Sequence, residues 1–262
     1  MEVNYDQLLL GKEIQLGEKA KLYIPTINDL VKQGQNELLA FSRAFVVSVR
    51  EQFSSVPEKV DEIEDKYPTF WEIAHDADMS KSVGEAMFGE GIDILSMMVA
   101  GLAYWTRTEM SDFQIMSNGK IVNEKIDLVV DKEMFLLFRS LLTMITNYEV
   151  DEDLIAPRGI SKKKNQCRIF KGIYKGRLRQ RKNHETKTLA DKILILETLT
   201  NSFIPFEQIG EMTYYQFTNL LNAYLSKRAN DQDFTIYTSY KFDTQNMKIT
   251  DLTNAIGVVK VK

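Results

Sequence analysis

Histidine and cysteine are scarce in this 262-residue chain, which limits the chemistry that its side chains can perform. His75 stands in the segment His-Asp-Ala-Asp, so one imidazole and two carboxylates lie close together along the chain. A metal site would need further ligands from elsewhere, and the spacing fits neither a zinc pattern nor an EF-hand. We therefore interpret His75 as a histidine at a helix end, beside solvated acids, and predict no metal site.

A thiol and an imidazole, Cys167 and His184, share one strongly basic segment, and neighbouring cations favour thiolates. No third residue that would orient the imidazole stands near them, and no nucleophile motif surrounds them.

The glycines of Phe88-Gly-Glu-Gly91 lack a preceding strand, a third glycine and the lysine of a phosphate-binding loop. We interpret Gly91 and Gly101 as points of close helix packing. The sequence predicts no catalytic residue, no cofactor and no enzymatic activity.

The strongest signal in the composition is a partition of charge. Residues 162–192 contain 12 Lys/Arg and two acids, a net charge of +10 in a chain whose total is −4. Residues 51–78 contain nine acids and two lysines. Such asymmetry indicates electrostatic contact with a surface of opposite sign. The candidate partner-binding cations are Lys162, Lys163, Lys164, Arg168, Lys171, Lys175, Arg177, Arg179, Arg181 and Lys182.

Two interpretations of these cations remain open. In the first, they follow a nucleic-acid backbone, with Phe170 and Tyr174 as interleaved aromatic residues. In the second, the segment is a solvated linker, or it docks on the acidic 51–78 region or on an acidic partner. The isoelectric point of 5.4 favours the second, because most of the surface would repel phosphate.

Hydropathy and cysteine usage indicate the compartment. The most apolar run, residues 94–105, is roughly half of the ~20 residues that a membrane helix needs. The first residues have neither the basic nor the apolar region of a signal peptide. A single cysteine precludes an intramolecular disulfide and fits a reducing cytosol. We therefore expect a protein that works in the cytoplasm and does not bind a membrane.

Apolar spacing and turn signals predict an α+β fold that is predominantly helical, with a helical core and two small β-hairpins. The hairpins are expected over residues 12–24 and 113–130, the second one turning at Asn118-Gly119. Long helices are expected over 27–53 and 80–106, with Val31 among the inward residues of the first. Further helices are expected to begin after Asp131 and after Thr188, the latter with Phe203 inward. Residues 234–242 alternate like a strand.

The clearest helix start in the chain is Met212-Thr-Tyr-Tyr-Gln-Phe217. Thr213 and Gln216 have the spacing of a capping box, and Met212 and Phe217 have the spacing of a hydrophobic staple around it. We expect this helix to run to about Arg228. For the domain organisation we predict a domain over 1–150 with both hairpins, a basic connector over 151–187 and a helical region over 188–262.

In their order, these features resemble the tail assembly chaperones of bacteriophages that infect low-GC Gram-positive hosts. In those proteins a Leu-Thr-x-Tyr-Gln-Phe motif likewise opens a C-terminal helix after a charged connector. The segments that carry the resemblance are Tyr5–Leu9, Tyr23–Ile27, the Asn118-Gly119 hairpin, Lys125–Val129, Phe135–Arg139, the basic connector, Leu189–Ile193 and Glu211–Phe217.

The resemblance implies a non-enzymatic protein that binds the tape measure protein and tail tube subunits in the host cytoplasm and is absent from the finished virion. It carries over no catalytic residue. Two alternatives stay open. One is a permanent virion component, such as a baseplate, connector or tail-completion protein, and the other is a nucleic-acid-binding regulator that uses residues 162–187. A homo-oligomer is compatible with each of them.

Overall fold

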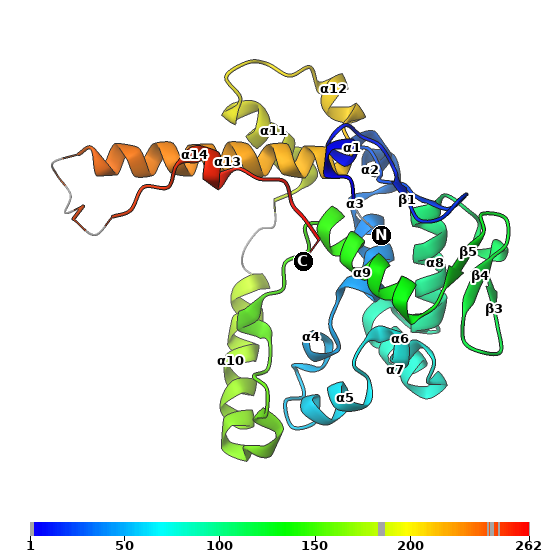
Figure 1. Ribbon diagram of the computed structural model, residues 1–262. Coiled ribbons are helices and arrows are strands. Elements are labelled where there is room, and N and C mark those ends of the chain that lie inside the picture. Colours follow the sequence, from blue (N-terminus) through cyan, green and yellow to red (C-terminus); the bar gives the residue numbers. More distant parts are fainter. Residues whose placement is uncertain (1–2, 183–186, 240, 242–243, 246, 262) are drawn as a thin grey trace. The chain divides into compact units, whose positions relative to one another are not determined.

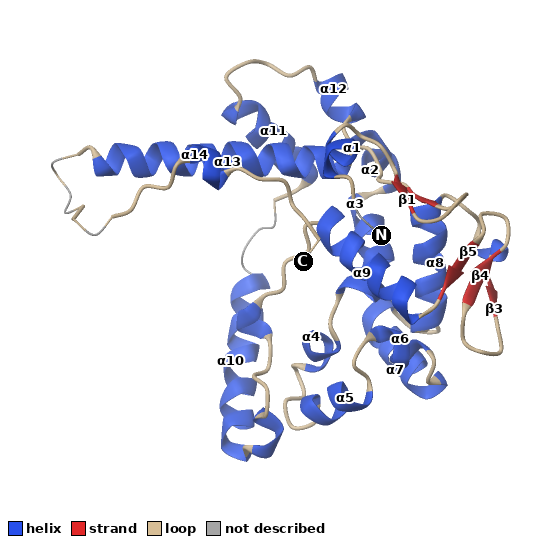
Figure 2. Ribbon diagram, viewed as in Figure 1, coloured by secondary structure: helices blue, strands red, loops and turns tan. Residues whose placement is uncertain are grey.

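The structure is a computed structural model that describes residues 3–182, 187–239, 241, 244–245 and 247–261. Helices dominate these residues, and two small antiparallel sheets accompany them (Figure 2), so the predicted α+β, predominantly helical class is confirmed. The chain divides into two compact units. The first unit comprises Met1–Ile14, Ile24–Gln35 and Lys187–Lys260, and the second comprises Gln15–Tyr23, Asn36–Thr186 and Val261–Lys262.

These units differ from the predicted division at residues 150 and 187, because part of the N-terminal region belongs with the C-terminal helices. Backbone hydrogen bonds join the two segments. Ile27 N donates to Met212 O over 2.9 Å, and Tyr214 N donates to Pro25 O over 2.8 Å. An antiparallel bridge pairs Thr26 with Thr213 between them. The two helices that these threonines cap therefore begin side by side.

The first unit is built around one long helix, α13 (Tyr214–Tyr237), whose Tyr215 and Phe217 are fully buried. The Tyr215 hydroxyl donates to Val259 O over 2.7 Å, which fastens the segment after α14 to this helix. The other helices of the unit are α1 (Tyr5–Leu9), α2 (Ile27–Gln33), α11 (Leu189–Leu199), α12 (Phe206–Glu211) and α14 (Leu252–Ala255).

The capping box predicted at Thr213 with Gln216 is confirmed, and Thr26 forms a second capping box with Asp29. Three other predictions are wrong. The helix α11 ends at Leu199, so Phe203 is exposed, and Val31 on α2 is exposed as well. The helix α13 continues past Arg228 to Tyr237, through residues that were predicted to begin a strand. Residues 229–237 contain no glycine or proline, so the helical hydrogen bonds continue through them.

The second unit has a helical core made by α3 (Gln35–Val46), α8 (Ile94–Thr106) and α9 (Lys132–Ile145), which lie together in Figure 1. The Phe45 ring lies 5.7 Å from the Phe135 ring and 5.9 Å from the Phe138 ring. The remaining elements are β1 (Ile14–Gln15), β2 (Lys21–Leu22), α4 (Val49–Phe53), α5 (Val60–Lys66), α6 (Phe70–Ala74), α7 (Ala77–Phe88), β3 (Gln114–Ile115), β4 (Ile121–Asn123), β5 (Leu128–Val130) and α10 (Lys164–Lys182), with 3-10 turns at Met110–Asp112, Glu152–Leu154 and Ile160–Lys162.

Two predicted long helices are interrupted. The one over 27–53 is three helices, because Gly34 has a φ of +97° and Ser48 caps α4 separately. The one over 80–106 is α7 and α8, separated by a turn in which Gly91 has a φ of +78°. Gly91 therefore serves a left-handed turn, which corrects its interpretation as a packing glycine. Gly101 is a point of close packing, since an added Cβ would lie 2.5 Å from Phe41 O.

Both predicted hairpins are present. The strands β1 and β2 form one, and Asn118-Gly119 turns between β3 and β4, which pair Ile115 with Ile121. Residues 121–130 are two strands, because β4 turns again and pairs with β5. The second sheet is therefore a three-stranded meander. Asp131 caps α9 as predicted, since its carboxylate accepts from Met134 N over 3.1 Å.

Candidate functional site

Within the predicted basic connector over 151–187, the 19 residues from Lys164 to Lys182 form a helix, α10. On its inner side Cys167, Phe170 and Tyr174 follow one another at helical spacing and pack against an apolar cluster. The Cys167 thiol is buried and donates to Ile160 O over 3.1 Å. Cys167 is thus a core residue, and the aromatic pair packs within the protein; His184 lies outside the described residues. The cluster is completed by Phe53, Val60, Ala156 and Ile160.

Three of the ten candidate cations form ion pairs that attach α10 to the rest of the second unit. Lys171 Nζ lies 2.8 Å from Glu58 Oε1, Arg177 Nη2 lies 3.0 Å from Asp153 Oδ1, and Arg181 pairs with Asp151. The hydrogen bond from Lys171 lowers the pKa of Glu58. Docking on the chain's own acids therefore occurs for these three. Only Glu58 belongs to the acidic 51–78 region that was expected to receive them, and the other two acids stand in the segment before α10.

Arg50, on α4, is 8% exposed and connects the segments that pack next to α10. Its guanidinium lies 2.6 Å from Asp61 Oδ1 and 2.5 Å from Glu64 Oε2, and it donates to Ala156 O over 2.9 Å. Asp61 in turn accepts from the backbone N–H of Ser161 over 3.0 Å. These contacts join α4 and α5 to the segment that leads into α10. Arg50 was not singled out by the sequence, where it resembles any other helical arginine.

The charge of Asp61 makes this junction sensitive to acid. Burial opposes ionisation of Asp61, but hydrogen bonds from Arg50, Ser161 and Gly159 outweigh it and hold its pKa far below the ordinary value. A carboxylate with a depressed folded-state pKa stabilises the fold above its unfolded pKa, about 3.9. That stabilisation is lost as the pH falls toward the folded-state value.

We therefore expect the free energy of unfolding to fall below about pH 4 in the wild-type chain. The Asp61→Asn variant will be less stable at neutral pH, and its stability will depend less steeply on pH in this window. Urea unfolding at a series of pH values measures both. An equal acid dependence in the variant and the wild type would contradict the assignment to Asp61.

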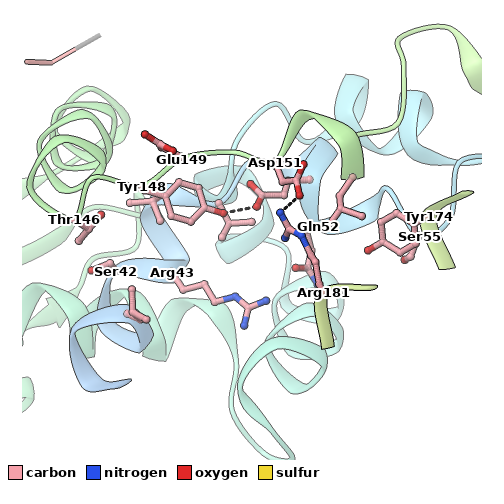
Figure 3. Close-up of a pocket in the computed structure, with 15 residues that line it drawn as sticks. Ser42, Arg43, Gln52, Ser55, Thr146, Tyr148, Glu149, Asp151, Tyr174 and Arg181 are labelled. Carbon is pink, nitrogen blue, oxygen red and sulfur yellow. Dashed lines mark hydrogen bonds and ion pairs between the residues drawn. The ribbon is translucent and has the colours of Figure 1, made fainter. Parts of the chain in front are cut away.

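A groove of about 600 Å³ runs beside α10 and is walled by α3, α4 and the segment 146–154 (Figure 3). Tyr148 and Arg181 point into it in this view, and the Tyr148 hydroxyl donates to Glu51. Burial raises the pKa of Tyr148, and the hydrogen bond to Glu51 raises it further, well above the ordinary value. Tyr148 is therefore a neutral hydrogen-bond donor. Because Tyr148 donates to Glu51 and Arg181 pairs with Asp151, these polar side chains of the groove are engaged within the chain.

The other candidate cations divide into two groups. Lys162, Lys163, Lys164, Arg168, Lys175 and Arg179 are exposed and make no hydrogen bond or ion pair through their side chains with another described residue. The side chain of Lys182 lies outside the described part of the chain, although its backbone ends α10. The structure thus separates docking cations from cations that are available to a partner.

His75 has a structural position. It follows α6 directly, as the predicted helix-end histidine, and its Nδ1 lies 2.7 Å from Trp71 O. Its Nε2 lies 2.7 Å from Gly119 O, which joins α6 to the turn of the second hairpin. Among the described residues, no group of three His, Cys, Asp or Glu side chains is arranged to hold a metal ion.

No protein-family model, no curated protein and no solved structure matches this chain. None of the described helices is both long enough and apolar enough to cross a lipid bilayer. The function is therefore inferred from the geometry above and from the resemblance in the order of the sequence features.

Proposed function

We propose that the chain is a non-enzymatic phage morphogenesis protein, a tail assembly chaperone that binds tape measure and tail tube subunits in the host cytoplasm. The observation that carries the proposal is an exposed aromatic pair in the first unit. Phe203 is 68% exposed and Phe206 is 54% exposed, and their rings meet edge to face with centroids 5.8 Å apart. Aromatic anchors of this kind contribute a large share of the energy of protein interfaces.

Other apolar side chains on helices of the same unit are exposed too. They include Leu194 on α11 and Leu225 and Phe234 on α13. A single exposed apolar residue is ordinary, but two exposed aromatic rings in contact with each other indicate a surface that a partner covers. A tape measure protein is a long helical chain that exposes apolar stripes before assembly, so it suits such a surface.

The helix start that contributed to the resemblance also supports the proposal. Thr213 N donates to Gln216 Oε1 over 2.8 Å, and Gln216 N donates to Thr213 Oγ1 over 3.2 Å, so the capping box is formed at the start of α13. The charged segment that precedes it in the sequence includes α10.

Co-expression with the tape measure and tail tube proteins of the same phage tests the proposal. We expect a soluble complex with one of them, and about a tenfold lower yield of that complex with the Phe203→Ser/Phe206→Ser variant, since two anchors are lost. Ile115→Ser/Met116→Ser is a matched control, because both side chains are apolar and exposed but belong to the second unit.

Two outcomes would contradict the proposal. If neither tail protein is recovered with the chain, the chain does not bind the clients that the proposal names. Stoichiometric presence of the chain in purified virions, measured by mass spectrometry, would instead favour a permanent virion component.

A further inference from the structure

The side of α10 that faces away from its packing cluster carries a straight row of cations. Lys164, Arg168, Lys175 and Arg179 are separated by four, seven and four residues, which places them on one line of a helix with 3.6 residues per turn. The row is about 22 Å long at 1.5 Å per residue. All four side chains are exposed.

An apolar edge runs parallel to this row. Ile169 is 59% exposed and Ile173 is 45% exposed, and they are four residues apart, so they lie one above the other on the helix. A second helix can pack against exposed isoleucine side chains of this kind and cover them.

Two glycines, Gly172 and Gly176, lie between the row of cations and the apolar edge. Glycine within a helix destabilises it by roughly 1 kcal/mol relative to alanine. Neither glycine has a positive φ, and an added Cβ would meet nothing within 4 Å at either position. The described fold therefore does not require glycine at these positions, whereas a partner backbone approaching closely would.

We propose that this free face of α10, made of the four cations, the two isoleucines and the two glycines, binds an amphipathic helix of another protein. The bound helix carries Asp and Glu along one edge and apolar residues along the adjacent edge. Charge complementarity selects the acidic edge. A second copy of α10 would repel this row, and a nucleic-acid backbone would make no use of the isoleucines or the glycines.

The fold prepares α10 for such binding. Its inner face is held by the ion pairs of Lys171, Arg177 and Arg181 and by the apolar cluster around Cys167. A partner therefore meets a helix that is already ordered, and binding does not have to order it. The inference rests on the proposed function only in that a tail protein would supply the acidic helix.

Fluorescence anisotropy with the full chain tests the inference. The probe is a labelled synthetic amphipathic helix of about 20 residues, matched to the length of α10, with Glu along one edge and Leu along the next. We expect Arg168→Glu/Arg179→Glu to weaken binding by at least about tenfold, because two attractive contacts become repulsive. Lys19→Glu/Lys81→Glu is the matched control, since both lysines are exposed elsewhere in the same unit, and its affinity will stay within about twofold.

A second variant keeps the charge constant. Gly172→Ala/Gly176→Ala will raise the thermal stability of the chain and still weaken binding by about tenfold, because the added methyl groups keep the partner backbone away. Unchanged affinity in this variant would overturn the inference. Circular dichroism melting of each variant shows that it remains folded.

A duplex DNA probe distinguishes the other partner class. Tighter binding to DNA than to the peptide, lost in the arginine variant and kept in the glycine variant, would overturn the inference in favour of nucleic acid. If a tail protein binds the wild type and the arginine variant equally, the inference fails while the chaperone proposal stands. If the peptide follows the expected pattern but no tail protein is recovered, the chaperone proposal fails alone.

Discussion

Replacing Arg50 with alanine will lower the free energy of unfolding by about 3–5 kcal/mol, the range for removing one partner of a buried ion pair. The substitution leaves the Asp61 and Glu64 carboxylates without the guanidinium that they share, and it also leaves Ala156 O without its donor. Burying such groups unpaired is what makes the loss large. Urea unfolding followed by circular dichroism measures it.

Arg158→Ala is the control for this prediction, because Arg158 is exposed and removal of such a side chain changes stability by less than about 0.5 kcal/mol. Hydrogen exchange gives a second measurement. In Arg50→Ala the amides of α10 will exchange faster, since the segment that leads into α10 loses its attachment to α4 and α5. A variant as stable as Arg158→Ala would show that the network around Arg50 contributes little.

Gly101→Ala will lower the free energy of unfolding by about 3 kcal/mol, the upper part of the usual range for overpacking a core. The added Cβ would lie 2.5 Å from Phe41 O and 2.7 Å from the Phe45 ring, so α8 and α3 must move apart. The same substitution at Gly172 will raise stability by roughly 0.5–1 kcal/mol, because that helical glycine has open space around it.

The two glycine variants control each other, since both replace glycine by alanine within a helix and differ only in what surrounds the new methyl group. Thermal unfolding of both proteins measures the difference. Equal effects at the two positions would contradict the close approach of α3 and α8 at Gly101.

The helix starts and the main turn were predictable because they depend on residues within three positions of one another. The capping boxes at Thr26 and Thr213 and the turn at Asn118-Gly119 are of this kind. The apolar spacing likewise predicted helices within residues 80–106 and after Asp131, where α8 and α9 form. What failed was helix length, because a repeat of apolar residues continues across the breaks at Gly34 and Gly91.

The candidate site divides in the same way. The sequence identified the basic segment and its ten cations, but their division into docking and exposed residues depends on acids outside that segment. Glu58, for example, pairs with Lys171 although the two residues are far apart in the chain. The role of Arg50 likewise requires carbonyl groups from residues 156 and 157.

Composition, charge partition and local hydrogen bonding were therefore determined by the sequence itself, since each is a property of a few neighbouring residues. Only the tertiary structure decided that the basic segment is a helix with one docked face and one free face. The physical reason is that burial and ion pairing depend on which distant groups meet in space, and the acids that pair with Lys171, Arg177 and Arg181 lie outside the helix.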